Sequence, residues 1–260
     1  MNNVMNKLTI SPIPAFSDNY IWLIQSGGNA YVVDPGETEP VLNALEHHGL
    51  ALEGILVTHH HYDHTGAVDA LKQATGCGVS GPPDSPAGPY DHIVHEGDIV
   101  DVLGVDFEVI SVPGHTLDHI AYFSGAENAL FCGDTLFVGG CGRVFEGSNE
   151  QMRASLAKLA ALPASSRVFC AHEYTLANLQ FALRVEPENR ALQAAIHHCA
   201  EKRDKGEPTV PSTLADELSY NPFLRWDSPE IRQTLSNKGL LEQDSDDGVF
   251  AAAREWKSQG

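Results

Sequence analysis

The sequence predicts an α/β protein whose β-sheets are covered by helices, followed by a separate helical domain. Up to about residue 174, short apolar and β-branched runs separated by Gly, Asn and Pro alternate with segments of helical periodicity. From residue 175 onward the periodic segments are all helical. We therefore expect an α/β domain of residues 1–174 and a helical domain of residues 175–260, both of ordinary domain length.

The strands of the first domain are indicated by runs of Val, Ile, Leu and aromatic residues that end at turn-forming residues. These runs cover residues 7–14, 19–25, 30–36, 52–58, 92–100, 105–114, 119–124, 128–137 and 167–175. Segments with helical spacing of apolar residues cover 39–49, 67–76 and 149–162. Gly49 and Gly76 are expected to end the first two helices, because Gly readily adopts the left-handed conformation that follows a helix.

Helices are also expected in the second domain, over residues 176–187, 189–206, 229–236 and 246–258. A stretch with several Pro, Ser and Thr residues, 206–225, separates the second of these helices from the third. Such a composition is typical of a connecting segment, so we expect a long loop there.

Composition and charge argue against two classes of protein. The formal net charge is −19, so the surface repels the phosphate backbone of nucleic acids. The apolar stretches are shorter than the roughly 18 residues of a membrane span, and the first residues do not resemble a signal peptide. The five cysteines form no CxxC pair. We therefore expect a cytoplasmic, monomeric protein that binds neither nucleic acid nor membranes.

The most informative segment is LVTHHHYDHTG, which follows an apolar strand and precedes a helix. On an extended segment alternate side chains share a face, so His59 and His61 point the same way and His60 points away. Asp63 and His64 follow as the chain turns, and they can reach a second point nearby. Four ionisable groups this close together have little structural use. The HxHxDH pattern therefore predicts two metal ions with two ligands each from this loop.

Further ligands are expected where other apolar strands end, because loops at strand ends carry the sites of α/β proteins. His115, Asp134 and His172 each occupy such a position. A carboxylate such as Asp134 can bridge two cations. The expected ligand sets are His59, His61, His115 and Asp134 for one ion, and Asp63, His64, His172 and Asp134 for the other. Imidazole and carboxylate suit zinc, and also iron or manganese, so two divalent ions per chain are the expected cofactor, with zinc the first choice.

The order of these residues resembles the metallo-β-lactamase superfamily, in which HxHxDH is followed by a later His, a later Asp and a final His. That resemblance implies an αββα sandwich with a dinuclear site at one edge. The segments FSDNYIWLI, THHHYDHTGAV, GDTLFVGGCGRVFEG, HEYTLANLQFALRVEPEN and GEPTVPSTLADELSYNPFLR together resemble one family of it, the glyoxalase II family of hydroxyacylglutathione hydrolases. The implied reaction hydrolyses S-D-lactoylglutathione to D-lactate and glutathione, the second step of glutathione-dependent methylglyoxal removal.

The implied chemistry suits the residues that the sequence supplies. Two metal ions would lower the pKa of a water molecule, so that hydroxide is available near pH 7 to attack the thioester carbonyl. A metal would also stabilise the oxyanion that forms. The leaving thiolate has a free pKa of about 8.5–9, judged from cysteine, so it departs without a strong general acid. The sequence accordingly shows many metal ligands and no obvious separate acid.

The resemblance also implies which residues bind the glutathione portion of the substrate. They are Arg143, Phe145, Tyr174, Asn178 (through water), Arg254 and Lys257. Arg254 and Lys257 share a face of the last expected helix, and they would supply the local positive charge that an anionic substrate needs on this acidic protein. Some family members have Tyr where this chain has Phe145, so one phenol hydrogen bond worth about 0.5–1.5 kcal/mol is absent.

Other functions compete with this interpretation. A related branch of the superfamily keeps HxHxDH but uses a single iron to oxidise glutathione persulfide, and the helical domain with Arg254 and Lys257 argues against it. A phosphodiesterase such as a tRNA-processing nuclease is disfavoured by the acidic surface. A non-catalytic metal-binding protein would be indicated by a missing ligand, whereas all the expected ligands are present.

Overall fold

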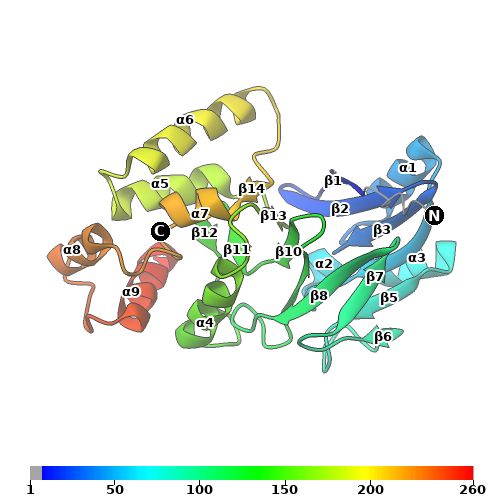
Figure 1. Cartoon of the computed structure of the whole chain (residues 1–260), viewed down its shortest axis with the longest axis horizontal. Coiled ribbons are helices and arrows are strands. Elements are labelled where there is room, and N and C mark those ends of the chain that lie inside the picture. Colours follow the sequence, from blue (N-terminus) through cyan, green and yellow to red (C-terminus); the bar gives the residue numbers. More distant parts are fainter. Residues whose placement is uncertain (1–7, 260) are drawn as a thin grey trace. The chain divides into compact units, whose positions relative to one another are not determined.

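The structure, a computed structural model, describes residues 8–259 (Figure 1). The chain divides into two compact units. The first unit is formed by the residues up to 111 together with 118–133, and the second by residues 112–117 and those from 134 onward. The strand expected over residues 7–14 begins at Thr9, and Lys7 lies outside the described residues.

The first unit contains a six-stranded sheet of order β1-β2-β3-β4-β5-β6. Its strands are β1 (Thr9–Ala15), β2 (Asn19–Ser26), β3 (Asn29–Val33), β4 (Ala51–Leu56), β5 (Gly78–Gly81) and β6 (His92–Ile93). The first three strands pair antiparallel, whereas β3 to β6 pair parallel. Parallel neighbours need crossover connections. The helices α1 (Thr38–His48) and α3 (Val68–Thr75) supply two of them.

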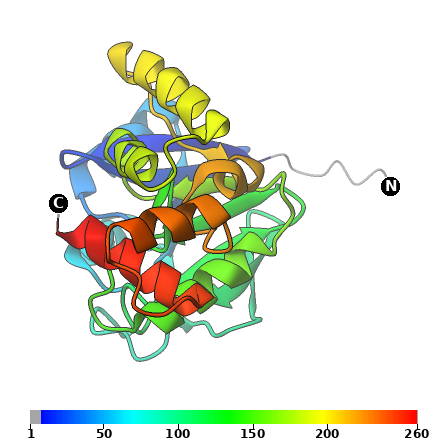
Figure 2. The same cartoon turned by 90° about the vertical axis from the view of Figure 1, so that its left-hand side faces the viewer.

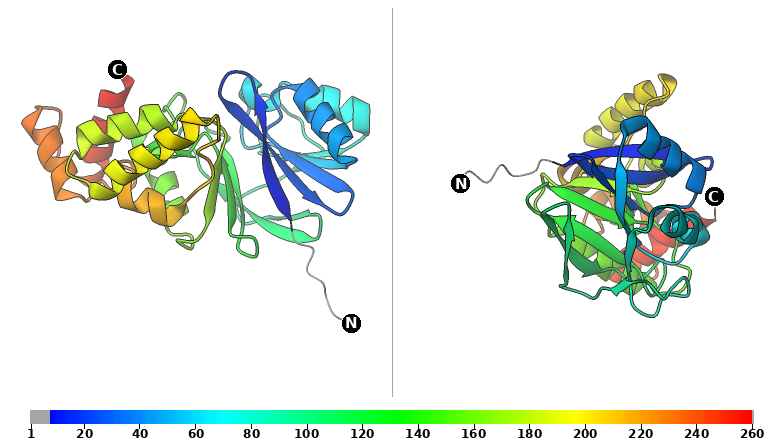
Figure 3. Two further views of the ribbon diagram at one scale, coloured as in Figure 1. Left: turned by 90° about the horizontal axis from the view of Figure 1, so that it is seen from above. Right: turned by 90° about the vertical axis from the view of Figure 1, so that its right-hand side faces the viewer.

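These two helices bury their apolar faces in one core with the sheet (Figure 3). The expected stops at Gly49 and Gly76 are confirmed, since both glycines follow their helix with left-handed backbone, φ 64° and 76°. The core contains Val41, Leu45, Val68 and Leu71 from the helices and Ile21, Leu23, Val32 and Ile55 from the strands. Burial of these apolar side chains stabilises the position of the carboxyl end of β4. The histidine segment continues from that end.

A second group of strands in the first unit is antiparallel, in the order β10-β9-β8-β7. These strands are β7 (Ile99–Val102), β8 (Val105–Ser111), β9 (Ile120–Ser124) and β10 (Ala129–Gly133). The hydroxyl of Tyr122 on β9 donates to the carbonyls of Val57 and Ser80, 2.9 and 3.3 Å away. The two groups of strands therefore meet beside the start of the histidine segment.

The prediction of a single strand over residues 92–100 is wrong. The chain forms β6 and β7 instead, and these strands belong to different sheets. Gly97 has φ 83°, and the Asp98 side chain accepts a hydrogen bond from the His95 amide. A left-handed glycine beside an aspartate that bonds the local backbone is typical of a turn, so this polar segment bends.

As far as the described residues go, the second unit contains short strand pairs and six helices. The strands are β11 (Leu136–Phe137), β12 (Gly140–Cys141), β13 (Arg167–Cys170) and β14 (Ser212–Thr213), with β11 paired to β12 and β13 to β14. The helices are α4 (Asn149–Ala160), α5 (Thr175–Val185), α6 (Arg190–Asp204), α7 (Leu214–Tyr220), α8 (Pro229–Asn237) and α9 (Asp246–Ser258). Helix α9 contacts α4 and α8, and α5 contacts α6 (Figure 2). Within residues 8–259 no helix combines the length and apolarity that crossing a bilayer requires.

Helix α7 lies in the stretch that was expected to be a loop. Thr213 begins it, because the Thr213 hydroxyl accepts from the Asp216 amide while the Asp216 carboxylate accepts from the Thr213 amide. This reciprocal pair is a capping box. The helix has only seven residues between proline-containing flanks, and that composition concealed it.

Candidate metal centre

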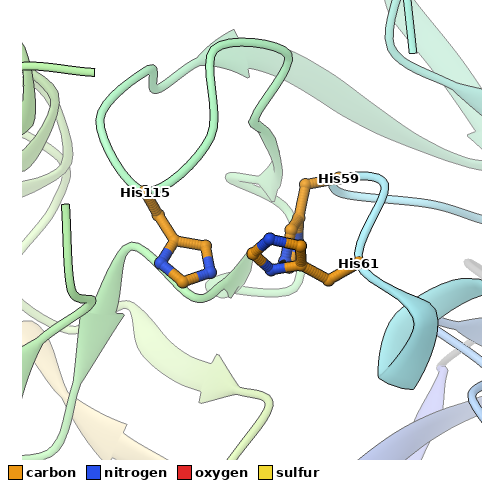
Figure 4. Close-up of side chains that lie close together, drawn as sticks. All are labelled: His59, His61 and His115. Atoms are coloured by element: carbon orange, nitrogen blue, oxygen red, sulfur yellow. Dashed lines mark hydrogen bonds between the residues drawn. The ribbon is translucent and has the colours of Figure 1, made fainter. Parts of the chain in front are cut away.

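The HxHxDH segment leaves β4 and passes through a short loop before the single-turn helix α2 (Tyr62–Thr65). Nε2 of His59 lies 3.1 Å from Nδ1 of His61, so two ring nitrogens face each other (Figure 4, which also draws His115 of the second unit). Two ligands at about 2.0–2.1 Å from a tetrahedral metal are about 3.3 Å apart. The spacing of these nitrogens is therefore close to that of two ligands of one ion.

Asp63 and His64 form a second pair of donors on the same segment. The turn of α2 brings Oδ2 of Asp63 to 3.4 Å from Nε2 of His64. The side chain of His64 is buried, and the same Oδ2 of Asp63 accepts a hydrogen bond from Nδ2 of Asn19 at 2.9 Å. Charge-assisted hydrogen bonds between such groups measure about 2.7–2.9 Å. The longer separation again fits two ligands of a metal better than a direct bond.

In the second unit Asp134 lies between two histidines. Its Oδ2 is 3.4 Å from Nε2 of His115, and its Oδ1 is 3.3 Å from Nε2 of His172. Each carboxylate oxygen thus faces a different imidazole. This is the arrangement that a carboxylate needs to bridge two cations, and the three side chains are all buried.

Asp34 orients the histidines of the first unit, and the sequence reasoning missed it. Its Oδ2 lies 3.0 Å from Nδ1 of His64, and its two oxygens accept from the amide and the hydroxyl of Thr58 at 2.8 and 2.7 Å. Because the Thr58 hydroxyl donates to Asp34, its oxygen is left to accept from Nδ1 of His59, 3.0 Å away. Both rings then present Nε2 to the site.

A signal for Asp34 was present in the sequence. In AYVVDPG it follows an apolar strand, as the expected ligands do. The residue also adopts φ 54°, which is uncommon for a residue other than glycine and is met more often by Asp and Asn. Asp34, His59 and His64 offer donor atoms within 4.8 Å of one another. The Asp34 oxygens already accept three hydrogen bonds, so this group orients rings and does not itself complete a metal site.

Two other contacts fix the remaining rings. Nδ1 of His115 donates to the Arg143 carbonyl at 2.7 Å, which leaves Nε2 toward Asp134. The buried ring of His119 stacks on His59, with centroids 4.5 Å apart and planes 12° from parallel. His60, expected to point away, places Nδ1 2.9 Å from Oδ1 of Asp118.

The donor set within each unit fits divalent metal ions. It consists of imidazole nitrogens and carboxylate oxygens at ligand spacing, and the other ring nitrogen of His59, His64 and His115 has its own oxygen partner. Metal-bound histidines almost always have such a partner, which fixes the ring and its tautomer. The chemistry of these donors favours zinc, iron or manganese over calcium.

The aromatic residues implied in substrate binding lie against ligand candidates of their own unit. Tyr174 stacks on His172 with centroids 4.6 Å apart and planes 6° from parallel, and its side chain is partly exposed. Phe145 meets the ring of His115 edge-on at 5.2 Å, and Arg143 lies 5.9 Å over the Phe145 ring. Phe145 is 60% exposed, so one face of it is open to solvent.

Of the three other residues implied in substrate binding, Asn178 and Lys257 link α5 to α9, and Arg254 links α9 to β12. Nζ of Lys257 donates to Oδ1 of the buried Asn178. Nη1 of the buried Arg254 donates to the Cys141 carbonyl at 3.0 Å. Burial, helped by the charge of Arg254, lowers the pKa of Lys257 to about 8. A cavity of about 480 Å³ is lined by Arg143, Arg254 and the start of α4.

Comparison with known proteins identifies the fold. Residues 15–172 match the family model of the metallo-β-lactamase superfamily. The crystal structure of ETHE1 from Myxococcus xanthus is 26% identical and has a TM-score of 0.64, covering 96% of this chain and 99% of that one. TTHA1623 in a di-iron-bound form is 29% identical with a TM-score of 0.55, covering 62% of this chain and 91% of that one. The chain has the metallo-β-lactamase fold, as its sequence predicts.

A narrower family follows from the rest of the chain. Residues 173–260 match the family model described as the hydroxyacylglutathione hydrolase C-terminus. A hydroxyacylglutathione hydrolase of Chromohalobacter salexigens is 51% identical over 255 residues, which cover 97% of this chain and 99% of that protein. The chain therefore belongs to the hydroxyacylglutathione hydrolase (glyoxalase II) family.

Proposed function

We propose that this protein hydrolyses S-D-lactoylglutathione to D-lactate and glutathione. The observation that carries the proposal is full-length similarity to hydroxyacylglutathione hydrolases, with 51% identity to one of them. The C-terminal helices belong to the same relationship, because residues 173–260 match that family's own C-terminal model.

The proposed cofactor is a pair of divalent metal ions, zinc in the first place. One ion would be held by His59, His61 and His115, the other by Asp63, His64 and His172, with Asp134 shared. The ligand-like spacings within each unit support this assignment, above all the two oxygens of Asp134 facing two histidines. Iron is the alternative, since one relative of the fold is a di-iron-bound form.

The residues of the chain then have separable tasks in the reaction. When bound, the two ions would lower the pKa of a water molecule and polarise the thioester carbonyl. Asp134 holds one oxygen toward His115 and the other toward His172. Asp34 and Thr58 keep the rings of the first unit in the tautomer with Nε2 available. A thiolate with a pKa of about 8.5 leaves without protonation, so no side chain need act as an acid.

We assign glutathione recognition to the second unit. Arg143 and Phe145 would contact the peptide beside His115, and Tyr174 would do so beside His172. The cationic side chains would pair with the substrate carboxylates, since Lys257 has the neutral Asn178 as its hydrogen-bond acceptor. Asn178 therefore acts by holding Lys257, and in addition through water. The residues in this assignment are Arg143, Phe145, Tyr174, Asn178, Arg254 and Lys257.

The proposed division of labour follows the predicted domains. Residues 1–174 would hold the metals and would also contribute Arg143, Phe145 and Tyr174 to glutathione binding. Residues 175–260 would contribute Asn178, Arg254 and Lys257, and the limits of the two matching family models support this division. We further propose that the protein works as a monomer in the cytoplasm, where its substrate would form. A net charge of −19 favours separation of the chains by mutual repulsion.

A thioesterase assay on S-D-lactoylglutathione, with metal content measured on the same sample, tests the proposal. The expected result is hydrolysis that disappears on chelation and returns with added metal, with two ions per chain. Oxygen uptake is measured on the same sample with glutathione persulfide. Robust uptake without thioester cleavage would replace the hydrolase with the competing persulfide dioxygenase, and neither activity with metal bound would indicate a metal-binding protein.

A further inference from the structure

The hairpin of β11 and β12 lies between two parts of the proposed site. Its strands have two residues each and are joined through Gly139, which has φ 64°. The hairpin begins two residues after Asp134 and ends two residues before Arg143. An isolated two-stranded hairpin is marginal in water even when it is longer. Other parts of the second unit must therefore determine its conformation.

Buried side chains hold the backbone of every residue from Phe137 to Cys141. They come from α5, from α7 with the residue that follows it, and from α9. The bonds are Asn221 Nδ2 to the carbonyls of Phe137 (3.1 Å) and Gly140 (2.9 Å), Asn178 Nδ2 to the Val138 carbonyl (3.1 Å), the Gly139 amide to Glu217 Oε2 (2.8 Å), and Arg254 Nη1 to the Cys141 carbonyl (3.0 Å).

Glu217 and Asn221 bind the hairpin together and also bind each other. Oε2 of Glu217 accepts from the Gly139 amide and also from Nδ2 of Asn221, 2.9 Å away. Oδ1 of Asn221 accepts from the Phe223 amide at 3.0 Å, so the orientation of the Asn221 amide is fixed by partners on both sides. Both side chains are fully buried. An unmade hydrogen bond at such a position costs about 1–3 kcal/mol, so the pair resists displacement.

The ends of the hairpin carry this constraint to two proposed ligands. The Gly142 amide donates to the Thr135 carbonyl at 3.2 Å, and a Cβ at Gly142 would lie 1.9 Å from the Asp134 carbonyl oxygen. The chain therefore closes tightly just below Asp134. The next residue, Arg143, offers its carbonyl to Nδ1 of His115 at 2.7 Å. The hairpin thus constrains the backbone position of Asp134. Through the Arg143 carbonyl it also constrains the orientation of the His115 ring.

We propose that Glu217 and Asn221 form a clamp on the β11–β12 hairpin that positions Asp134 and His115 for metal binding and thioester hydrolysis. Neither residue touches a ligand candidate, so both are positioning residues. The proposal rests on the proposed function for its kinetic part only. Its metal-binding part can be measured without substrate.

Glu217→Gln is the first test, because it keeps the shape and replaces one of the two accepting oxygens with an NH2 donor. Both oxygens of Glu217 accept hydrogen bonds, Oε2 from Gly139 and Asn221 and Oε1 from Tyr220, so in either orientation the amide nitrogen of glutamine faces a donor. Misplaced supports of metal ligands cost about 10–100-fold in affinity or activity. We expect the metal-loaded full-length variant to lose metal to a chelator at least about tenfold faster than wild type, and its kcat to fall by a similar factor. Asn221→Ala should change both quantities in the same direction.

Glu186→Gln is the matched control. Glu186 is another buried glutamate of the second unit, bonded to Arg225 and Ser228 and not to the hairpin. It should lower thermal stability but leave metal release and kcat at wild-type values below the unfolding temperature. The double variant Glu217→Gln/Asn221→Ala should be no worse than the poorer single one, because the two residues act together.

The clamp is refuted if Glu217→Gln or Asn221→Ala folds and keeps the wild-type rate of metal release and the wild-type kcat. If both fail to fold, Tyr220→Phe decides, since it removes only the hydroxyl that donates to Oε1 of Glu217 at 3.0 Å. A smaller loss in both readouts supports the clamp, and wild-type values overturn it. A wild-type protein that binds metal but does not hydrolyse the thioester would refute the proposed function. The clamp would then be tested by the rate of metal release alone.

Discussion

Nδ1 of His64 lies 3.0 Å from the carboxylate of Asp34, which at the same time accepts two hydrogen bonds from Thr58. We expect Asp34→Asn to disturb both partners, because an amide nitrogen replaces one accepting oxygen. Loss of such a support typically costs about 10–100-fold in metal affinity or activity. The measurement is kcat/KM together with metal affinity from chelator competition. Asp106→Asn, a change on an exposed aspartate, serves as the control and should behave as wild type.

Neighbouring histidines of the HxHxDH segment should respond in opposite ways to the same substitution. His60→Ala should leave both metals bound, because His60 pairs with Asp118. His61→Ala should lose at least one ion, since Nδ1 of His61 faces Nε2 of His59 at ligand spacing. The measurement is the number of metal ions bound per folded chain in each of the two variants. A metal-depleted His60→Ala variant would show that the alternation argument assigned the wrong rings.

Removal of Asp134 should affect both ions at once. Each of its oxygens faces a different histidine, so Asp134→Ala takes one ligand from each proposed metal. We expect loss of both ions and of thioesterase activity. Elemental analysis of the purified variant is the check. Two ions still bound per chain would contradict the bridging role, even if activity were lost.

The affinity for an anionic substrate should weaken as pH rises through about 8. Burial, followed by the charge of Arg254, lowers the pKa of Lys257 to about 8, so the ammonium loses its proton near that pH. The neutral amine no longer attracts a carboxylate. We expect KM for lactoylglutathione to increase above pH 8, with kcat less affected. In Lys257→Gln the KM should be high already at pH 7 and should lose this pH dependence; an unchanged KM profile would remove Lys257 from substrate binding.

Protein stability should carry a pH signature from Glu217. Burial raises the pKa of Glu217 to about 7, against the opposing hydrogen bonds from Ser212, Gly139 and Asn221. The folded state therefore binds more protons than the unfolded state between pH 4.5 and 7. Stability falls as pH rises through this window, by on the order of 3 kcal/mol. The unfolding free energy of wild type relative to Glu217→Gln, from denaturant titration at several pH values, should decline accordingly.

Glu186→Gln gives the opposite sign and so checks the measurement. Burial works to raise the pKa of Glu186, but hydrogen bonds from Arg225, Ser228 and Asn189 outweigh it and hold the pKa below its usual value. Its stabilising contribution is present above the unfolded pKa and is lost as pH falls below 4.5. Wild type should therefore lose stability relative to Glu186→Gln only at acid pH. The same slope for both variants would show that neither glutamate causes it.

Local features were predictable because they depend on residues near one another in the chain. The αββα class, most strands and the helix ends at Gly49 and Gly76 follow from hydrophobic period and from glycine backbone freedom. The ends of apolar strands indicated the ligand candidates in the same way. Helix α7 and the turn at Gly97 were missed, because short polar elements have too little hydrophobic period to stand out from a loop.

The sequence by itself determined which residue types stand at the ends of strands, and these predict the chemistry of a metal-dependent hydrolase. Only the tertiary structure decided which groups orient those residues. Asp34 reaches His64 across 30 residues, and Asn221 reaches Phe137 across 84. A hydrogen bond between such distant residues depends on how the backbone packs and leaves no periodic trace in the sequence. The candidate ligands could therefore be proposed from the sequence, whereas the Asp34 support and the proposed Glu217–Asn221 clamp required the folded chain.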